Sequence, residues 1–196
     1  MKDKVAFILY GTDEWILEEN LEYIRCLSVP DDVEIEIYKQ DSRQGVPECL
    51  ENGRVQSDAG YKVYLDQNAY IIDKDFIQKF LDVFRQNPQI GMLGTRGYLW
   101  NQEKNEAEFE GCNLSHVYAD MSFVRELREG TSTGIRPVLA LDRHLMITHV
   151  DTPWTGEENN FHITKSVELL HAGIETAVLV EDKPMVLFDN GILAEN

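Results

Sequence analysis

Short apolar runs and helical periodicities alternate along the first half of the chain. Residues 5–10 form a continuous apolar run rich in strand-forming residues, which is typical of a strand covered on both faces. Thr12 and Asp13 follow, and either side chain can cap a helix. Apolar residues then recur at near-helical spacing, which predicts a helix. These residues are Trp15, Ile16, Leu21, Ile24 and Leu27.

The same alternation predicts the further elements. Strands are expected at residues 33–38, 61–65, 90–94 and 178–180, and helices at about 47–57, 76–87 and 161–171. Residues 138–142 and 144–148 are expected to form two paired strands, and the polar stretch 101–110 a surface loop. Strands that alternate with helices favour an α/β domain whose sheet is parallel, with right-handed crossovers.

The expected topology also predicts where a ligand would lie. In parallel sheets covered by helices, ligands bind beyond the carboxyl ends of the strands. The residues that follow Tyr10, Leu65 and Gly94 are therefore expected to line one common crevice.

Length and charge narrow the range of functions. The chain has 196 residues, of which 43% are hydrophobic, enough for one sizeable core and short for two domains. Its 35 acidic residues against 18 basic ones give a net charge of -17 at pH 7. A field of this sign repels a nucleic-acid backbone, so we expect no general nucleic-acid binding. An anionic nucleotide would need a divalent cation, backbone N–H groups or a few local basic residues.

The cysteines and the apolar runs indicate a cytoplasmic protein. Cys26, Cys49 and Cys112 are far apart and match no disulfide framework or zinc-site spacing, so buried or inert thiols are the simplest interpretation. No apolar run approaches the roughly 20 residues that span a bilayer. The run at residues 5–10 is also too short for a secretory signal. Association into a homo-oligomer is left open.

One tripeptide, Asp66-Gln67-Asn68, places carboxylate and amide oxygens directly after an expected strand. Alternation along a strand puts Asp66 and Asn68 on the same side. Such oxygens are the ligands that Mg²⁺ and Mn²⁺ prefer, and these ions bridge a diphosphate to an acidic protein. The alternative is that the two residues only form an Asx-turn as the chain leaves the strand.

Several segments carry a family likeness. They are residues 57–68 followed by Tyr70-Ile71-Ile72, the opening strand with residues 17–24, Leu141-Asp142, Pro153-Trp154, and Ser166-Val167-Glu168 before Ala172-Gly173. In this order they resemble a small glycosyltransferase-like family that takes its name from a streptomycin-biosynthesis protein and is related to glycosyltransferase family 2. The likeness runs along most of the chain.

The resemblance implies a GT-A fold, a Rossmann-like domain with a mixed, mostly parallel sheet flanked by helices. It also implies a nucleoside-diphosphate sugar as donor, a glycan or small molecule as acceptor, and Mn²⁺ or Mg²⁺ as cofactor. About residues 1–97 would bind the nucleotide and about 98–196 the sugar and acceptor. Asp66 and Asn68 would hold the metal or the diphosphate. The nucleotide would be bound by Tyr10, Thr12, Asp13, Asp41, Asp58 and Gln67.

Catalysis would then be inverting, with Asp142 on the sugar or acceptor side and a general base from Glu157, Glu158 or His162. Two adjacent carboxylates at a helix N-terminus can differ in pKa, so that one of them accepts a proton near neutral pH. The alternative is that they only complement the helix dipole. His162 can act as a base near neutral pH or be a capping or buried histidine.

The chain also departs from the family pattern. Relatives usually show His-Gln-Asp in place of Asp66-Gln67-Asn68, an Asp in place of His162 and a His in place of Phe188. A catalytically degenerate member that binds a nucleotide, a glycan or a protein is therefore the main alternative. A flavodoxin-like binding or signalling domain would fit the early alternation of strands and helices, but it explains neither the context of Asp66 nor the segment from Leu141 to Gly173.

Overall fold

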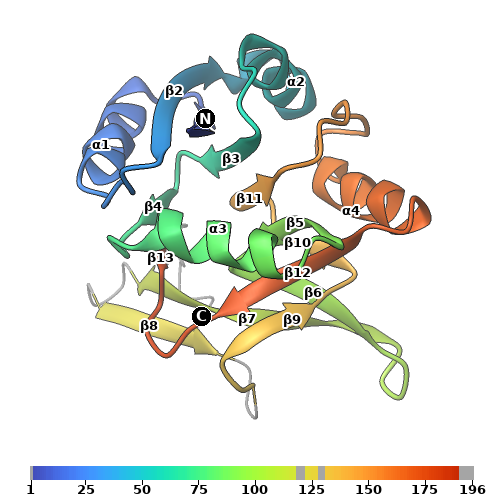
Figure 1. Cartoon of the computed structure of the whole chain (residues 1–196). Helices are drawn as coiled ribbons and strands as arrows, with labels where there is room; N and C mark the ends of the chain where they lie inside the picture. Colours follow the sequence, from blue (N-terminus) through green and yellow to red (C-terminus); the bar gives the residue numbers. More distant parts are fainter. Residues whose placement is uncertain (1, 118–121, 128–130, 190–196) are drawn as a thin grey trace.

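The computed structural model describes residues 2–117, 122–127 and 131–189, which form a helix-covered sheet standing on a second, smaller sheet (Figure 1). The helices are α1 (Glu14–Arg25), α2 (Val46–Gln56), α3 (Phe76–Gln86) and α4 (Phe161–His171), with a 3-10 turn at Ser42–Gln44. The larger sheet contains β1 (Asp3–Gly11), β2 (Val33–Asp41), β3 (Tyr61–Asp66), β5 (Ile90–Gly94), β9 (Gly134–Pro137), β11 (Leu145–Thr148) and β12 (Glu175–Val180). The smaller sheet contains β4 (Ala69–Ile71), β6 (Arg96–Asn101), β7 (Glu106–Val117), β8 (Ser122–Leu127), β10 (Ala140–Leu141) and β13 (Val186–Phe188).

The larger sheet has the order β2-β1-β3-β11-β5-β12-β9. Its β1 is parallel to β2 and β3, and β5 is parallel to β12, whereas β11 runs antiparallel to both of its neighbours. β9 runs antiparallel to β12, so three of the six pairings are parallel and five of the seven strands point the same way. The sheet is mixed, and the α/β fold class is confirmed. Strands from both halves of the sequence share this one sheet.

Two apolar layers hold the helices against the faces of the larger sheet. Alternate residues of β1 point to opposite faces, because successive side chains along a strand alternate. Val5, Phe7 and Leu9 join the core formed with α1 and α3, and Ile8 and Tyr10 join the core formed with α2 and α4. The continuous apolar run that predicted a doubly covered strand is thus explained by helices on both sides.

The helix ends agree with most of the expected signals. Asp13 caps α1 by accepting hydrogen bonds from the N–H groups of Trp15 and Ile16. Gly173 ends α4 with a φ of 77°, a conformation that favours glycine. Trp15 was counted in the apolar spacing that predicted α1, but its side chain is 87% exposed because it lies off the buried face formed by Leu17, Leu21 and Ile24. No helix within the described ranges is long and apolar enough to cross a membrane.

Two sequence-based expectations were wrong. The expected loop at residues 101–110 is largely a hairpin in which β6 pairs with β7, and only a short turn separates the two strands. Its polar residues had suggested a loop because most of this hairpin's side chains face solvent. The segments 138–142 and 144–148 do not pair with each other: β10 pairs with β6, whereas β11 inserts between β3 and β5.

Candidate functional site

The carboxyl ends of β1 and β3 meet the turn that joins β10 to β11. Tyr10 lies opposite Asp66 in the sheet register, and its buried hydroxyl donates a hydrogen bond to the carbonyl oxygen of Arg143. The N–H of Asp66 donates to the carbonyl oxygen of His144 at 2.9 Å. Burial raises the pKa of Tyr10 well above its ordinary value, so its hydroxyl remains a donor. These contacts hold the turn at residues 142–144 directly beside Asp66.

Asp66 and Asn68 form the Asx-turn that was one of the two expectations. One carboxylate oxygen of Asp66, Oδ1, accepts from the N–H of Asn68 at 2.9 Å and from its side-chain amide at 3.0 Å. The other oxygen has no hydrogen-bond partner among the described residues, and the half-buried carboxylate forms no ion pair with any of them. Asp66 therefore retains one oxygen that a ligand could reach.

Gln67 joins the ends of β1 and β3 to the start of α1. Its side-chain oxygen accepts hydrogen bonds from the N–H groups of Thr12 and Asp13, at 2.7 and 2.9 Å. Its carbonyl oxygen accepts from the amide of Asn20 at 2.7 Å. A Cβ at Gly11 would lie 2.2 Å from the side-chain oxygen of Gln67, so the close approach requires glycine there. Gln67 thus organises this edge through its own hydrogen bonds.

Asp142 is buried and has several polar partners. It accepts a hydrogen bond from the Tyr98 hydroxyl at 2.9 Å and from the N–H of His144 at 3.0 Å, and it contacts the His144 ring as well. Arg96 approaches it at 3.8 Å. Burial acts to raise the pKa of Asp142, but hydrogen bonds from His144 outweigh it and hold that pKa well below its ordinary value. Asp142 is therefore a fixed negative charge whose oxygens are already occupied.

His162 lies in the first turn of α4, close enough to Asp142 and Arg143 for their charges to act on its pKa. Its side chain is buried, and its Nδ1 has no hydrogen-bond partner among the described residues. Burial lowers the pKa of His162, and the nearby negative charge of Asp142 only partly opposes this effect. The imidazole is therefore neutral at pH 7 and can accept a proton.

The remaining acidic candidates near this edge of the sheet are Glu158, Asp41 and Glu157. The Glu158 carboxylate accepts a hydrogen bond at 2.7 Å from the N–H of Val46, at the start of α2. Asp41 lies level with Gly11 at the end of β2, where hydrogen bonds from Arg43 lower its pKa to about 2. Glu157 is exposed. Glu158 thus caps a helix that begins beside the same edge of the sheet.

Asp58 does not belong to this group, although it was expected to contact the nucleotide. It precedes β3, and its Oδ1 forms an exposed ion pair with Nζ of Lys4, near the start of β1, at a distance of 2.9 Å. Five residue steps separate the two ends of β3, which corresponds to roughly 16 Å. Asp58 therefore lies at the amino edge of the sheet, away from Asp66.

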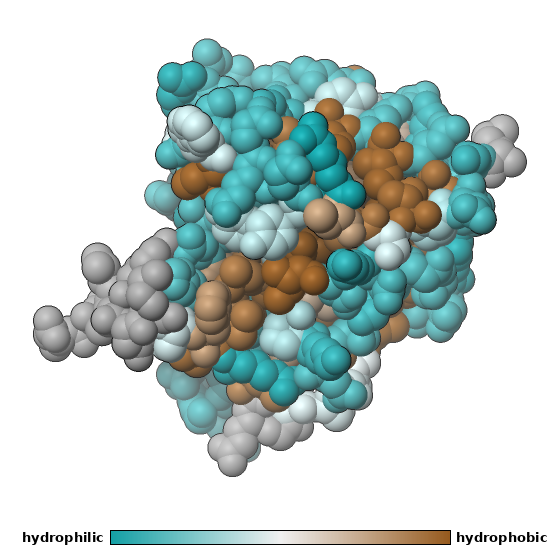
Figure 2. Space-filling view, turned by 90° about the vertical axis from the view of Figure 1, so that its left-hand side faces the viewer, coloured by the Kyte–Doolittle hydropathy of each residue, from teal (hydrophilic) through white to brown (hydrophobic). Residues whose placement is uncertain are grey.

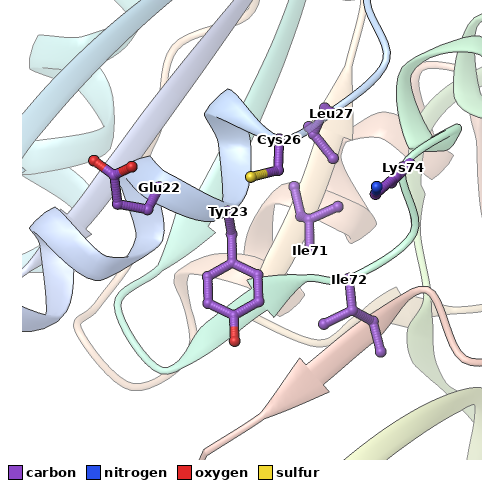
Figure 3. Close-up of a pocket in the computed structure, with 7 residues that line it drawn as sticks. All are labelled: Glu22, Tyr23, Cys26, Leu27, Ile71, Ile72 and Lys74. Atoms are coloured by element: carbon purple, nitrogen blue, oxygen red, sulfur yellow. The ribbon is translucent and has the colours of Figure 1, made fainter.

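An apolar hollow lies elsewhere in the molecule. It has a volume of about 290 Å³ and is formed by the last turn of α1 and the segment after β4, the opposite end of α1 from Asp13 (Figure 3). Its lining residues are Glu22, Tyr23, Cys26, Leu27, Ile71, Ile72 and Lys74. Figure 2 looks onto the side of the molecule that carries α1 and β4 and shows apolar side chains gathered across it.

Asp66 offers a divalent metal ion one unoccupied carboxylate oxygen. Within the described residues, no group of three or more His, Cys, Asp or Glu side chains could hold a metal ion. Mg²⁺, however, is commonly held by one or two carboxylates together with substrate phosphates and water. The unoccupied oxygen of Asp66 fits a metal ion that binds together with a diphosphate, but not one held by the protein alone.

Comparison with known proteins identifies the class of protein. Residues 6–196 match the model of a glycosyltransferase-like family. The chain belongs to this family, as the sequence resemblance had implied. A search of curated proteins found no similar sequence.

Solved structures show the same fold. The mannosyltransferase PcManGT from Pyrobaculum calidifontis, in complex with GDP-Man and Mn²⁺, has 11% identity and a TM-score of 0.58, and the match covers 100% of this chain and 59% of that one. Residues 1–349 of S. aureus TarS have 11% identity and a TM-score of 0.55, with 96% of this chain and 60% of that one covered. The chain thus has a GT-A glycosyltransferase fold and spans about six-tenths of the length of these two structures.

Sequence reasoning missed part of this site. The sequence did not predict that Tyr98 and Arg96 of β6 contact Asp142, because this contact depends on the pairing of β6 with β10. The adjacency of Asp142, Arg143 and His144 after an apolar segment was the available signal in the sequence.

Proposed function

We propose that this protein transfers a sugar from a nucleoside-diphosphate donor to a hydroxyl group of an acceptor. The observation that supports this most strongly is the convergence of Asp66, Asp142 and His162 at the carboxyl edge of a GT-A sheet. Ligands of such sheets bind at this edge. The acceptor belongs to the glycans or small molecules that carry free hydroxyl groups.

The donor would lie across the ends of β1, β2 and β3. Thr12 and Asp13 would face the nucleoside together with Tyr10 and Asp41, in a frame that Gln67 holds by its hydrogen bonds. Asp66, beside Asn68, would contact Mn²⁺ or Mg²⁺ through its remaining oxygen. When bound, such an ion stabilises the negative charge that develops on the leaving diphosphate. A solved relative of this fold that carries GDP-Man and Mn²⁺ supports this donor class.

The acceptor hydroxyl would be deprotonated by His162, which is neutral because burial lowers its pKa. Attack by this hydroxyl on the face opposite the diphosphate would invert the anomeric carbon. Asp142 would stabilise the imidazolium that forms, since its charge already favours protonation of His162. Glu157 and Glu158 remain second candidates for the base, although Glu158 is engaged by the N–H of Val46.

The alternative is a domain of the same fold that binds a nucleotide or a glycan without catalysis. The supporting observation is that Asp66 is partly engaged by Asn68 in an Asx-turn. Such a binding domain would keep the hydrogen bonds of Thr12 and Asp13 to Gln67 and would not transfer a sugar.

A two-stage experiment separates these functions. Thermal shifts are measured with UDP-, GDP- and dTDP-sugars, with and without Mn²⁺, for the unmodified protein, Asp66→Ala and the control Asp58→Ala. We expect one diphosphate series to stabilise the protein, with the effect reduced by Asp66→Ala and unchanged by Asp58→Ala. The stabilising donor is then incubated with an acceptor-hydroxyl panel, and release of the nucleoside diphosphate is measured.

The outcomes are distinct. Release that depends on an acceptor supports the transferase, and stabilisation without release supports the binding domain. If no nucleotide sugar changes the melting temperature, the transferase and the nucleotide-binding alternative are both wrong.

A further inference from the structure

The charge of the protein opposes the ligand that its proposed function requires. The net charge is -17, and Asp66 and Asp142 both lie at the candidate site. A diphosphate adds further negative charge there, and like charges a few ångströms apart repel one another at a protein surface. Asp66 is also joined to Asn68 and not to a second carboxylate, so the protein holds a divalent cation only weakly. Another source of positive charge is needed at this place.

Four basic side chains in the described part of the chain have no hydrogen-bond or ion-pair partner there. They are Lys2, Lys74, Arg143 and Lys183. Lys2 precedes β1, and Lys74 and Lys183 line a hollow of about 440 Å³ next to the start of α3. Only Arg143 lies in the turn beside Asp66.

The backbone of Arg143 is fixed, whereas its guanidinium group is exposed. The hydroxyl of Tyr10 donates to its carbonyl oxygen, and the next carbonyl, that of His144, accepts from the N–H of Asp66 at 2.9 Å. The side chain itself is exposed to solvent. The guanidinium is close enough to both Tyr10 and His162 for its charge to act on their ionisation.

The neighbouring carboxylate of Asp142 forms no ion pair with Arg143. The oxygens of Asp142 are occupied by Tyr98 and His144, and Arg96 rather than Arg143 approaches it. Arg96 is in turn paired with Glu126 at 2.9 Å. The saturation of Asp142 thus leaves the guanidinium of Arg143 available for an anion.

We propose that Arg143 binds the diphosphate of the donor and supplies much of the positive charge that this acidic site needs. The inference rests on the proposed function. A guanidinium presents parallel N–H donors that match two phosphate oxygens, and it remains charged at any relevant pH. Because the turn that carries Arg143 is bonded to Asp66 and the charge of Arg143 acts on His162, the phosphates would be held beside the place where the sugar would react. Diphosphate binding then persists when divalent metal is removed.

Isothermal titration calorimetry tests this inference with the nucleotide series selected by the thermal shifts. The nucleoside, its monophosphate and its diphosphate are titrated in EDTA and again in MnCl₂. The proteins are the unmodified chain, Arg143→Gln, Arg143→Lys and the control Lys183→Gln, which removes an equally exposed, unpaired charge elsewhere. Circular dichroism and melting temperature establish that each variant is folded.

We expect the unmodified protein to bind the diphosphate in EDTA. Arg143→Gln should weaken this binding by about tenfold or more, the effect of losing a charge-assisted contact, and Arg143→Lys should restore part of it. Affinity for the nucleoside should be unchanged in every variant, as should diphosphate affinity in Lys183→Gln.

Failure of the inference differs from failure of the proposed function. If the unmodified protein binds the diphosphate and Arg143→Gln binds it equally well, the assignment of Arg143 is wrong and the nucleotide-sugar function stands. The assignment of Arg143 is also wrong if the diphosphate does not bind in EDTA and Arg143→Gln leaves its binding in MnCl₂ unchanged. If no diphosphate binds under either condition, the proposed function itself is wrong.

Discussion

The Tyr10 hydroxyl donates a hydrogen bond to the carbonyl oxygen of Arg143, a residue 133 positions further along the chain. This contact joins the end of the first strand to the turn that carries Asp142 and His144. Because Asp66 bonds the same turn from the neighbouring strand, two halves of the sequence are locked together at the candidate site. The buried hydroxyl of Tyr10 and the backbone of Asp66 therefore both fix the position of this turn.

Replacing Tyr10 by Phe should destabilise the protein by about 1–3 kcal/mol, because the carbonyl oxygen of Arg143 loses its buried donor. The free energy of unfolding is measured by urea denaturation. Tyr38→Phe is the matched control, because its hydroxyl bonds the side chain of Glu36 near the surface, and we expect it to cost less than about 1 kcal/mol. Equal effects of the two variants would contradict a special role for the Tyr10 contact.

Gly11→Ala should disrupt the start of α1. The added Cβ would lie 2.2 Å from the Gln67 side-chain oxygen, so Gln67 must move and the N–H groups of Thr12 and Asp13 lose their acceptor. We expect a loss of about 1–3 kcal/mol in the free energy of unfolding. Gly60→Ala, where nothing lies within 4 Å of the added Cβ, should be close to neutral, and a neutral Gly11→Ala would show that this edge rearranges freely.

The pH dependence of transfer should report the ionisation of His162. Burial lowers its pKa, so the neutral, proton-accepting form persists below the ordinary histidine value of about 6.5. The acid limb of the transfer rate against pH should therefore lie below 6.5, and His162→Gln should abolish transfer without weakening nucleotide binding. His171→Gln, at the other end of α4, is the control. A His162→Gln protein with full transfer activity would leave Glu157 and Glu158 as the base candidates.

Because of Lys165, the stability of the folded protein should change with pH in the alkaline range. Its buried ammonium donates to the carbonyl oxygens of Thr152 and Pro153, and burial lowers its pKa to about 8, against 10.5 ordinarily. Between these two values the unfolded chain binds more protons than the folded one, so this residue's contribution to stability rises with pH across that window.

Comparison with Lys165→Met isolates this effect from other groups that titrate there. As pH rises from about 8 to about 10, the unfolding free energy of the unmodified protein should increase relative to that of Lys165→Met. Urea denaturation at several pH values measures it. A difference that stays constant with pH would mean that the Lys165 pKa is not lowered.

Local patterns predicted most of the elements correctly, because their signals lie within one segment. The apolar run at residues 5–10 and the Asp13 cap need only their neighbours in sequence, and both features are present in the structure. The assignment of residues 101–110 to a loop was wrong because a solvent-facing hairpin has no apolar face to mark it. The exposure of Trp15 could not be predicted, since apolar spacing does not say which face a first-turn residue takes.

The sequence by itself determined an acidic α/β domain of a glycosyltransferase-like family, with Asp66 at a strand end. Only the tertiary structure decided which polar residues meet. It separated Asp58 from Asp66, and it brought Arg143 to Asp66 by inserting β11 between β3 and β5. The physical reason is that hydrophobic periodicity reports which face of an element is buried, whereas pairing between distant strands decides which of their ends become neighbours.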